Sequence, residues 1–193
     1  SRVSRTFRNA ALQLARQHPF ARKLVNSGRL SVPAFLVRSA LNTPDADAFE
    51  GNMVPGAPMD DAPVRVDGQD AWLLDQLGNR FVLMVFADRP DALPAAVLGL
   101  AQSLATAPIP VETVVVSAHE GPSTEGLRVI HDRDGLMAQR YDAGPGAAYL
   151  VRPDQHVAAR WRRVEGADVA SALARATGRA LPAQAATEPA LAA

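Results

Sequence analysis

The chain has 193 residues, of which 48% are hydrophobic, and its 20 basic and 20 acidic residues give a formal net charge of zero. This length allows one well-packed domain with extensions, and the neutral balance gives no indication of a nucleic-acid or membrane partner. No apolar run is long enough to span a membrane. The absence of cysteine excludes disulfides, thiolate catalysis and cysteine metal ligands, and it is compatible with a cytoplasmic location.

The N-terminal region is the basic part of the chain. Residues 1–44 carry eight Arg or Lys and no acid, whereas residues 45–193 carry twelve basic and twenty acidic residues. Apolar residues at spacings of three and four predict an amphipathic helix over residues 2–26, broken or kinked at His18-Pro19. We therefore expect a helical arm over residues 1–41. By composition alone it is a solvated basic helix, and a targeting helix or a nucleic-acid arm are weaker alternatives.

Residues 42–63 are predicted to be a linker. This stretch contains four prolines and two glycines, and its apolar residues follow no period.

A compact domain is expected over residues 64–179. Continuous apolar runs predict buried strands at Phe81–Phe86 and Val111–Val116, and the alanine- and leucine-rich stretch between them predicts a helix and therefore a parallel crossover. Further elements are predicted as a short edge strand (Val64–Val66), a short helix or turn (Ala71–Leu77), a helix (Pro90–Thr106), an extended piece (Leu127–Ile130) and a helix (Gly135–Tyr141).

The end of the domain is predicted to be a hairpin followed by a helix. The strand-like runs Ala147–Arg152 and His156–Arg162 are separated by Pro153-Asp154-Gln155, a turn sequence. A helix is expected at Ala167–Thr177, and the Ala- and Pro-rich residues 180–193 are expected to be a disordered tail. Gly144-Pro145-Gly146 turns the chain sharply into the first run, which predicts a cis Gly144–Pro145 bond.

This order of elements is the closing half of a thioredoxin-like fold, in which a proline precedes a central strand, a hairpin and a last helix. The predicted fold class is therefore α/β, with a central mixed sheet flanked by helices. The helical arm and the Pro-rich linker precede it.

Three stretches carry a resemblance to one family. They are R-Y-D-A-G-P-G-A-A-Y-L-V-R-P-D-Q-H-V-A-A-R-W from Arg140 to Trp161, L-V-N-S-G-R-L-S-V-P from Leu24 to Pro33, and G-N-M-V-P-G-A-P from Gly51 to Pro58. They resemble the C-terminal region of FAD-dependent aromatic-ring hydroxylases, the phenol hydroxylase and 3-(3-hydroxyphenyl)propionate hydroxylase group. The resemblance spans most of residues 5–178.

The resemblance implies a parent enzyme in which NAD(P)H reduces FAD and one atom of O2 is transferred to a phenolic ring. The family's flavin-binding signatures lie upstream of the matching region. The implied partners are therefore upstream flavin- and substrate-binding domains, together with a homodimer contact. No nucleic-acid or membrane partner is implied.

No residue of this chain is predicted to be catalytic, cofactor-binding or metal-binding. Ala87-Asp88-Arg89-Pro90 follows the first buried strand, where thioredoxin relatives carry their redox loop, and it offers no thiol. No G-x-G-x-x-G joins a strand to a helix. The residues considered and set aside are His18, His119, His131 and His156 as metal ligands, Asp132 and Asp134 as a calcium loop, and Ser117, His119 and Ser123 as a nucleophile and base.

Several of these polar residues have simpler expected roles. Asp134 is predicted to cap the following helix. Arg160, Arg162 and Arg163 are predicted to form a basic strand end, which is either a solvated edge or the charged rim of a contact with another domain.

Two functions therefore remain. The chain is either the structural and dimerising C-terminal portion of a flavin hydroxylase, inactive by itself, or a free-standing, redox-inactive thioredoxin-like module that binds another protein. A reading frame that continues upstream of Ser1 into a flavin-binding domain would favour the first, and a start codon immediately before Ser1 would favour the second.

Overall fold

The computed structural model describes residues 33–124 and 126–179, together with residues 6, 9, 10, 13, 14 and 18. The chain divides into two compact units, Ser1–Ala34 and Phe35–Ala193. In the first unit residues 6, 9, 10, 13 and 14 are helical, and the His18 amide donates to the Leu14 carbonyl at 2.9 Å. The rest of the expected arm up to residue 32, and the expected tail at 180–193, lie outside the described residues.

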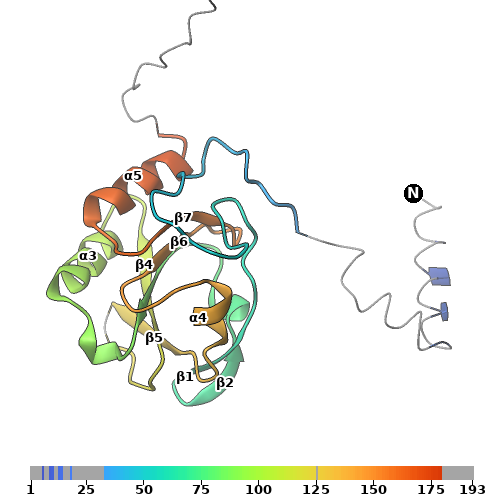
Figure 1. Ribbon diagram of the computed structural model, residues 1–193, viewed down its shortest axis with the longest axis horizontal. Coiled ribbons are helices and arrows are strands. Elements are labelled where there is room, and N and C mark those ends of the chain that lie inside the picture. Colours follow the sequence, from blue (N-terminus) through green and yellow to red (C-terminus); the bar gives the residue numbers. More distant parts are fainter. Residues whose placement is uncertain are drawn as a thin grey trace, which may run out of the picture. The chain divides into compact units, whose positions relative to one another are not determined.

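The second unit is built on one seven-stranded sheet with the order β2-β1-β5-β4-β3-β6-β7 (Figure 1). Strand β4 pairs in parallel with β3 and with β5, and all other pairings are antiparallel. The strands are β1 (Pro63–Val66), β2 (Gln69–Trp72), β3 (Phe81–Ala87), β4 (Val111–Ser117), β5 (Leu127–His131), β6 (Ala148–Val151) and β7 (Val157–Trp161). The predicted α/β class, the parallel crossover between the two apolar runs and the closing hairpin are confirmed.

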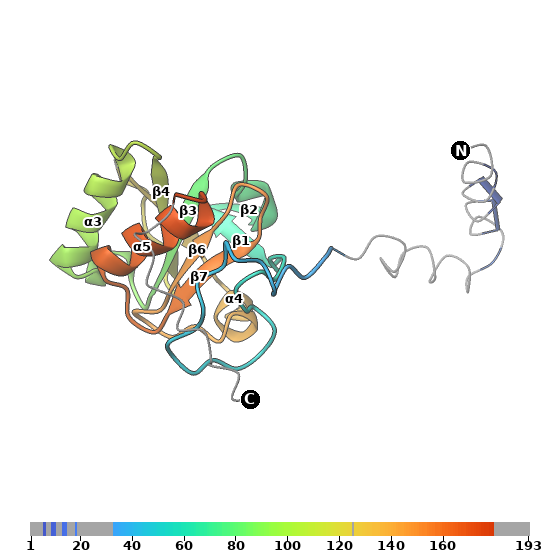
Figure 2. The ribbon, with the colours of Figure 1, turned by 90° about the horizontal axis from the view of Figure 1, so that it is seen from above.

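Both faces of the sheet are covered (Figures 1 and 2). Helices α3 (Ala95–Ala105) and α5 (Gly166–Ala176) cover one face, and the short helix α4 (Leu136–Arg140) lies on the other. Alternate residues of β3 point to the two faces, because successive side chains of a strand alternate. Val82, Met84 and Phe86 belong to the core cluster on the α4 side, and Leu83 and Val85 belong to the cluster on the α3 and α5 side.

Two predicted elements differ from the structure near the sheet edge. Strand β1 is not an edge strand, because β2 pairs with it on one side and β5 pairs with it on the other. The segment Ala71–Leu77, predicted to be a short helix or turn, begins inside β2 and continues as the 3-10 helix η1 (Leu74–Gln76). Only four residues form β2, too few to show an alternating pattern.

The predicted helix Pro90–Thr106 is divided in two. The 3-10 helix η2 (Pro90–Ala92) precedes α3, and Pro94 is the N-cap of α3 with φ −59° and ψ 144°. A proline has no amide hydrogen and it disfavours the helical region for the residue before it, so α3 begins after Pro94.

Residues 42–63, expected to be a linker, form part of the folded unit. Met53 and Ala57 are buried in the core cluster on the α4 side, together with Met59 and Ala62. Because α4 has only five residues, this irregular segment completes the layer that α4 begins. The boundary expected at residue 64 therefore falls inside the compact unit that starts at Phe35.

The predicted cis bond between Gly144 and Pro145 is wrong, because no peptide bond among the described residues is cis. The turn is closed by the Ala147 amide, which donates to the Gly144 carbonyl at 3.0 Å, and Gly146 has φ +95°. Proline at the second position and a glycine with positive φ at the third are the requirements of a type II turn with a trans proline. The Gly146 amide donates to the Phe86 carbonyl at 2.8 Å, which attaches the turn to the end of β3.

We predict that Gly146→Ala destabilises the chain and that Gly144→Ala does not. A side chain at φ +95° is strained by roughly 1–2 kcal/mol, whereas a Cβ on Gly144 would meet no atom within 4 Å. Urea unfolding followed by circular dichroism would measure the two free energies. Equal effects of the two substitutions would contradict the type II turn.

We also predict that Met53→Ala lowers the free energy of unfolding by about 2–4 kcal/mol, because it empties a buried site in the core. Met53 is 2% exposed, while its neighbour Asn52 is exposed and provides the matched control Asn52→Ala. If 42–63 were a tether outside the core, both substitutions would leave the unfolding midpoint unchanged.

Candidate functional site

The main cluster of ion pairs and side-chain hydrogen bonds among the described residues surrounds Arg160 on β7. Its side chain is 3% exposed, and its Nε and Nη2 donate to the two carboxylate oxygens of Asp45 at 2.9 and 2.6 Å. The guanidinium also lies over the ring of Phe49, 4.4 Å from the ring centre. Burial acts to lower the pKa of Arg160, but hydrogen bonds to Asp45 and Tyr149 more than offset it, so the pKa is raised. Arg160 therefore remains charged, and it binds the segment that precedes the sheet.

Arg162, the residue directly after β7, makes a similar set of contacts. Its guanidinium carbon lies 3.9 Å from the centre of the Phe49 ring. The guanidinium also pairs with the Asp142 carboxylate and donates from Nη2 to the Ala48 carbonyl at 2.9 Å. The Glu50 amide donates to Asp142 at 2.7 Å, and this bond, followed by the contact with Arg162, lowers the pKa of Asp142. We call Asp45, Phe49, Asp142, Arg160 and Arg162 the clamp.

Backbone hydrogen bonds extend the clamp along β7. The Thr43 amide donates to the Ala158 carbonyl at 2.9 Å. Val157 exchanges bonds with the segment, since the Gly56 amide donates to its carbonyl at 2.7 Å and its own amide donates to Ala57 at 2.9 Å. These bonds satisfy backbone groups that an edge strand would otherwise expose. The chain that enters the domain is therefore fixed to β7 by both side chains and backbone.

Two buried tyrosines lie beneath the clamp. The Tyr149 hydroxyl donates to the Tyr141 carbonyl, and the Tyr141 hydroxyl donates to the Asp60 carbonyl at 2.7 Å. Burial raises the pKa of both phenols, and that of Tyr141 is raised well above its ordinary value. Both hydroxyls therefore stay neutral and serve as donors within the core.

The carboxyl end of β3, where the redox loop was considered, holds a polar anchor. The buried Ser117 hydroxyl donates to the Asp88 carbonyl at 3.1 Å and accepts from the His119 amide at 3.1 Å. The Nδ1 atom of His119 lies 2.9 Å from the same carbonyl oxygen. Ser117 and His119 are thus brought together, but the serine hydroxyl binds a backbone carbonyl and not the imidazole. Ser123 lies elsewhere, bonded to Asp67 and to the Val129 amide.

An open pocket of about 570 Å³ adjoins this loop, between η2, α3 and the start of α5. Its lining is mostly apolar and includes Leu93 and Val97, while the charged residues of the lining are Asp88, Arg163 and Glu165. Such a pocket can bind an apolar group.

The acidic residues near α4 are structural. Asp132, which is buried, accepts hydrogen bonds from the amides of Met137 and Ala138 at 3.1 and 2.9 Å. The predicted cap Asp134 makes no such bond and instead pairs with Arg133 at 3.0 Å. The prediction placed the cap two residues too late. The residue that binds the first free amides of α4 is Asp132, which lies before the helix and not at its N-cap position.

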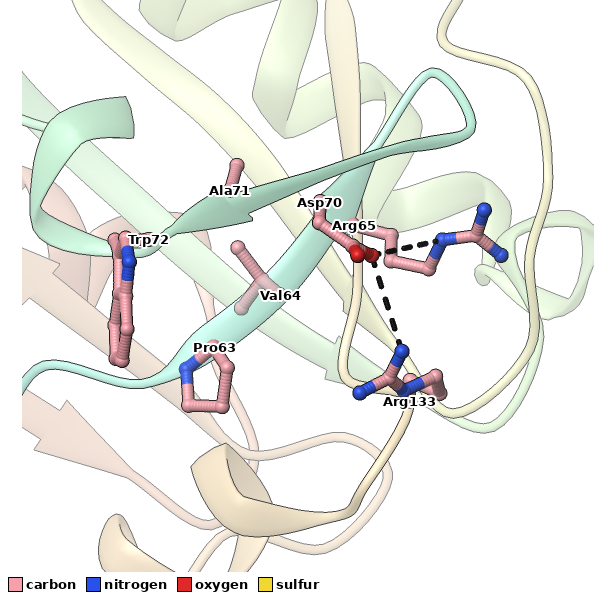
Figure 3. A pocket seen from close by; sticks show the side chains of 7 residues that line it. All are labelled: Pro63, Val64, Arg65, Asp70, Ala71, Trp72 and Arg133. Atoms are coloured by element: carbon pink, nitrogen blue, oxygen red, sulfur yellow. Dashed lines mark ion pairs between the residues drawn. The ribbon is translucent and has the colours of Figure 1, made fainter.

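A smaller pocket of about 200 Å³ lies at the β2 edge (Figure 3). The carboxylate of Asp70 lies 3.4 Å from Nε of Arg65 and 3.8 Å from Nη1 of Arg133, and the exposed ring of Trp72 stands on the far side. Asp70 is 80% exposed, so solvent screens both ion pairs.

Within residues 33–124 and 126–179, and the six described positions before them, no three His, Asp or Glu side chains are grouped to hold a metal ion. Within the same residues no helix has the length and hydrophobicity needed to cross a membrane.

Comparison with known proteins identifies the family. Residues 59–176 match the profile of the HcaD C-terminal domain. No significant match is found among curated proteins. Two similar solved structures are the flavin-dependent monooxygenase PieE in complex with FAD and substrate (22% identity, TM-score 0.57, covering 74% of this chain and 25% of PieE) and aklavinone-11 hydroxylase in complex with FAD and aklavinone (22%, 0.55, 74% and 26%).

A third solved structure, thiol peroxidase from Chromobacterium violaceum, is 12% identical with a TM-score of 0.52, and the match covers 69% of this chain and 93% of the peroxidase. At these identities the likeness establishes the fold, which is thioredoxin-like as predicted. The chain spans about a quarter of the length of the two monooxygenases. The predicted resemblance to the C-terminal region of FAD-dependent aromatic hydroxylases is confirmed. Since the profile covers more than half of its residues, the chain belongs to the HcaD C-terminal domain family.

Proposed function

We propose that this chain is the C-terminal structural portion of a cytoplasmic FAD-dependent monooxygenase that hydroxylates a phenolic ring with NAD(P)H and O2. One observation carries the proposal. This chain, a member of the HcaD C-terminal domain family, is structurally similar to about a quarter of the length of each of two flavin monooxygenases, and both were solved in complex with FAD. In the parent enzyme the chain also contributes to a homodimer.

Neither candidate turn among the described residues fits the flavin. A dinucleotide pyrophosphate is held by backbone amides of a glycine-rich turn between a strand and a helix N-terminus. After β3 the chain reads Asp88-Arg89-Pro90, and Pro90 has no amide hydrogen to donate. The Gly144-Pro145-Gly146 turn precedes a strand, and its Gly146 amide is already bonded to Phe86. We therefore assign FAD and NAD(P)H to upstream domains.

What the chain contributes is a rigid end for the parent polypeptide. The clamp and the buried residues of 42–63 support this role, because they convert the entry segment into part of the domain core. A domain whose entry segment is fixed at several points transmits position to its neighbour better than one on a flexible tether.

We predict that the purified chain binds no FAD and oxidises no NADPH. The measurement is a titration of FAD with the chain at physiological salt, followed by flavin fluorescence. The polypeptide extended upstream in the same reading frame should bind FAD and become yellow, and ring hydroxylation can then be assayed. Stoichiometric binding of FAD by the chain alone at micromolar concentrations would refute the assignment of the flavin to upstream domains.

The clamp gives a second prediction. Asp45→Ala should lower the free energy of unfolding by about 2–3 kcal/mol, less than the roughly 3–5 kcal/mol for a fully buried pair, because the Asp45 side chain is 28% exposed. Asp45→Ala combined with Arg160→Met should cost less than the sum of the two single changes, since no buried charge is then left unpaired.

The matched control is Asp91→Ala, which removes an ion pair with Arg89 at 3.0 Å in which both side chains are exposed. It should leave the unfolding midpoint unchanged, because solvent screens this pair. Additive effects of the Asp45 and Arg160 changes would show that the clamp does not hold the segment.

A second candidate function is a free-standing module that binds another protein, and the apolar pocket beside η2 and α3 favours it. The two functions differ in the upstream reading frame. If the extended polypeptide contains no flavin-binding domain, the binding module becomes the better assignment.

A further inference from the structure

The segment at the start of the second compact unit exposes a cluster of apolar side chains. Phe35, Leu36, Val37 and Leu41 are 51%, 36%, 52% and 36% exposed. We call these four residues the 35–41 patch. The other large apolar residues exposed in the described part of the chain, Leu14, Trp72 and Leu98, are separated from it in the sequence. A cluster of exposed apolar side chains marks an interaction surface, whereas single ones are ordinary.

The backbone of this segment is held in place although its side chains face solvent. The Leu36 amide donates to the Gly56 carbonyl at 2.7 Å, and the Leu36 carbonyl accepts from the buried Asn42 side chain at 2.7 Å. Asn42 also donates to the Pro55 carbonyl at 3.3 Å. A Cβ at Gly56 would lie 2.5 Å from the Leu36 oxygen, so the close approach of the two chains requires glycine.

A fixed backbone makes this patch suited to binding. A segment that is ordered before it meets its partner loses less conformational entropy on association than a mobile one. Two successive turns add to the order, since the Ser39 amide donates to Leu36 and the Asn42 amide donates to Ser39. The patch therefore presents four apolar side chains in one defined arrangement.

The size of the patch decides between two occupants. A stable interface between separate molecules buries about 800 Å² of each partner, and four side chains that are at most 52% exposed offer much less. A partner in the same polypeptide needs less contact area, because covalent linkage gives it an effective concentration in the millimolar range. The compact unit begins at Phe35, so the preceding polypeptide enters the unit at the patch itself.

We propose that the 35–41 patch is the surface on which the preceding flavin- and substrate-binding part of the same polypeptide docks. The inference rests on the proposed function, in which about three quarters of the parent enzyme lies outside this chain. The chemistry of the docked surface follows from the patch: an apolar depression for Phe35 and Val37, bordered by a carboxylate for Arg38. Arg38 is exposed and makes no ion pair within the described residues.

The absence of cysteine from this chain allows a direct test. Val37→Cys introduces one thiol in the patch, and Leu98→Cys introduces a control thiol on α3 with 38% exposure. Each variant is made in the chain alone and in the polypeptide extended upstream. The rate of alkylation is measured, and the labelled peptide is identified by mass spectrometry so that upstream thiols do not interfere.

We expect Val37→Cys to react at least about tenfold more slowly in the extended polypeptide than in the chain alone, which corresponds to a docking free energy of about 1.4 kcal/mol. Leu98→Cys should react at the same rate in both. Equal rates for Val37→Cys in the two proteins would overturn the proposal. Protection in the chain alone that increases with its concentration would also overturn it, in favour of a second copy.

The visible spectrum of the extended polypeptide separates this inference from the proposed function. A yellow protein with an unprotected Val37→Cys thiol would keep the function and reject the docking surface. A protected thiol in a polypeptide without flavin would reject the function, and it would keep only the docking of the preceding polypeptide on the patch. Substitution of Val37 by serine in the chain alone should leave its unfolding midpoint unchanged, because that side chain is exposed.

Discussion

The buried guanidinium of Arg160 is the constraint on which the entry side of the domain depends. A charge that is 97% removed from solvent needs a close counter-charge, because its desolvation costs several kcal/mol, and Asp45 provides that charge through two hydrogen bonds. Asp45 lies 115 positions before Arg160, so this pair fixes one point on the path of the preceding chain, and the backbone bonds of Thr43, Gly56 and Ala57 to β7 fix others. Once that path is fixed, Met53, Ala57 and their neighbours are delivered to the sheet face that α4 is too short to cover.

The regular elements were predictable because their apolar residues follow simple patterns. Continuous runs identified β3 and β4, and Pro153-Asp154-Gln155 identified the closing hairpin. The role of residues 42–63 was not predictable in this way. An irregular backbone has no fixed side-chain period, so its buried residues leave no regular apolar pattern in the sequence. Prolines are typical of a tether, but they are equally suited to an extended segment that covers a sheet face without donating backbone hydrogen bonds. Their burial becomes visible only when the sheet they cover is known.

The clamp was missed although the sequence holds a signal for it. Arg160 and Arg162 are two residues apart in the predicted extended run His156–Arg162, a spacing that favours one face, and Asp45 and Asp47 have the same spacing. Asp45 binds the Arg160 side chain and Asp47 accepts from the Arg162 amide at 2.8 Å. Two acids with the same spacing as two arginines indicate two extended segments that lie side by side. The prediction of a basic strand end considered the segment of Arg160 alone and therefore overlooked this signal.

The error at Pro145 has a similar origin. Analogy with thioredoxin relatives favoured a cis bond, but the local residues favoured another turn, since glycine after proline supplies the positive φ of a type II turn. The turn still brings the chain back to Phe86, whose carbonyl accepts from the Gly146 amide. Fold-level analogy predicted where the chain goes, and the local residues determined how it turns.

The end of β3 shows why this fold can serve as a scaffold. The fold positions a loop there, and in this chain Ser117 and His119 both bind the Asp88 backbone carbonyl, so polar groups that could act on a ligand instead fix the loop. The two edge strands of the sheet are protected in different ways. Strand β7 is covered by the entry segment, while β2 is short and carries the exposed Asp70, a charge that opposes addition of another strand. With one edge covered and the other guarded by charge, the contact that we propose with a preceding domain would use side chains outside the sheet, such as the ordered apolar residues of the 35–41 patch.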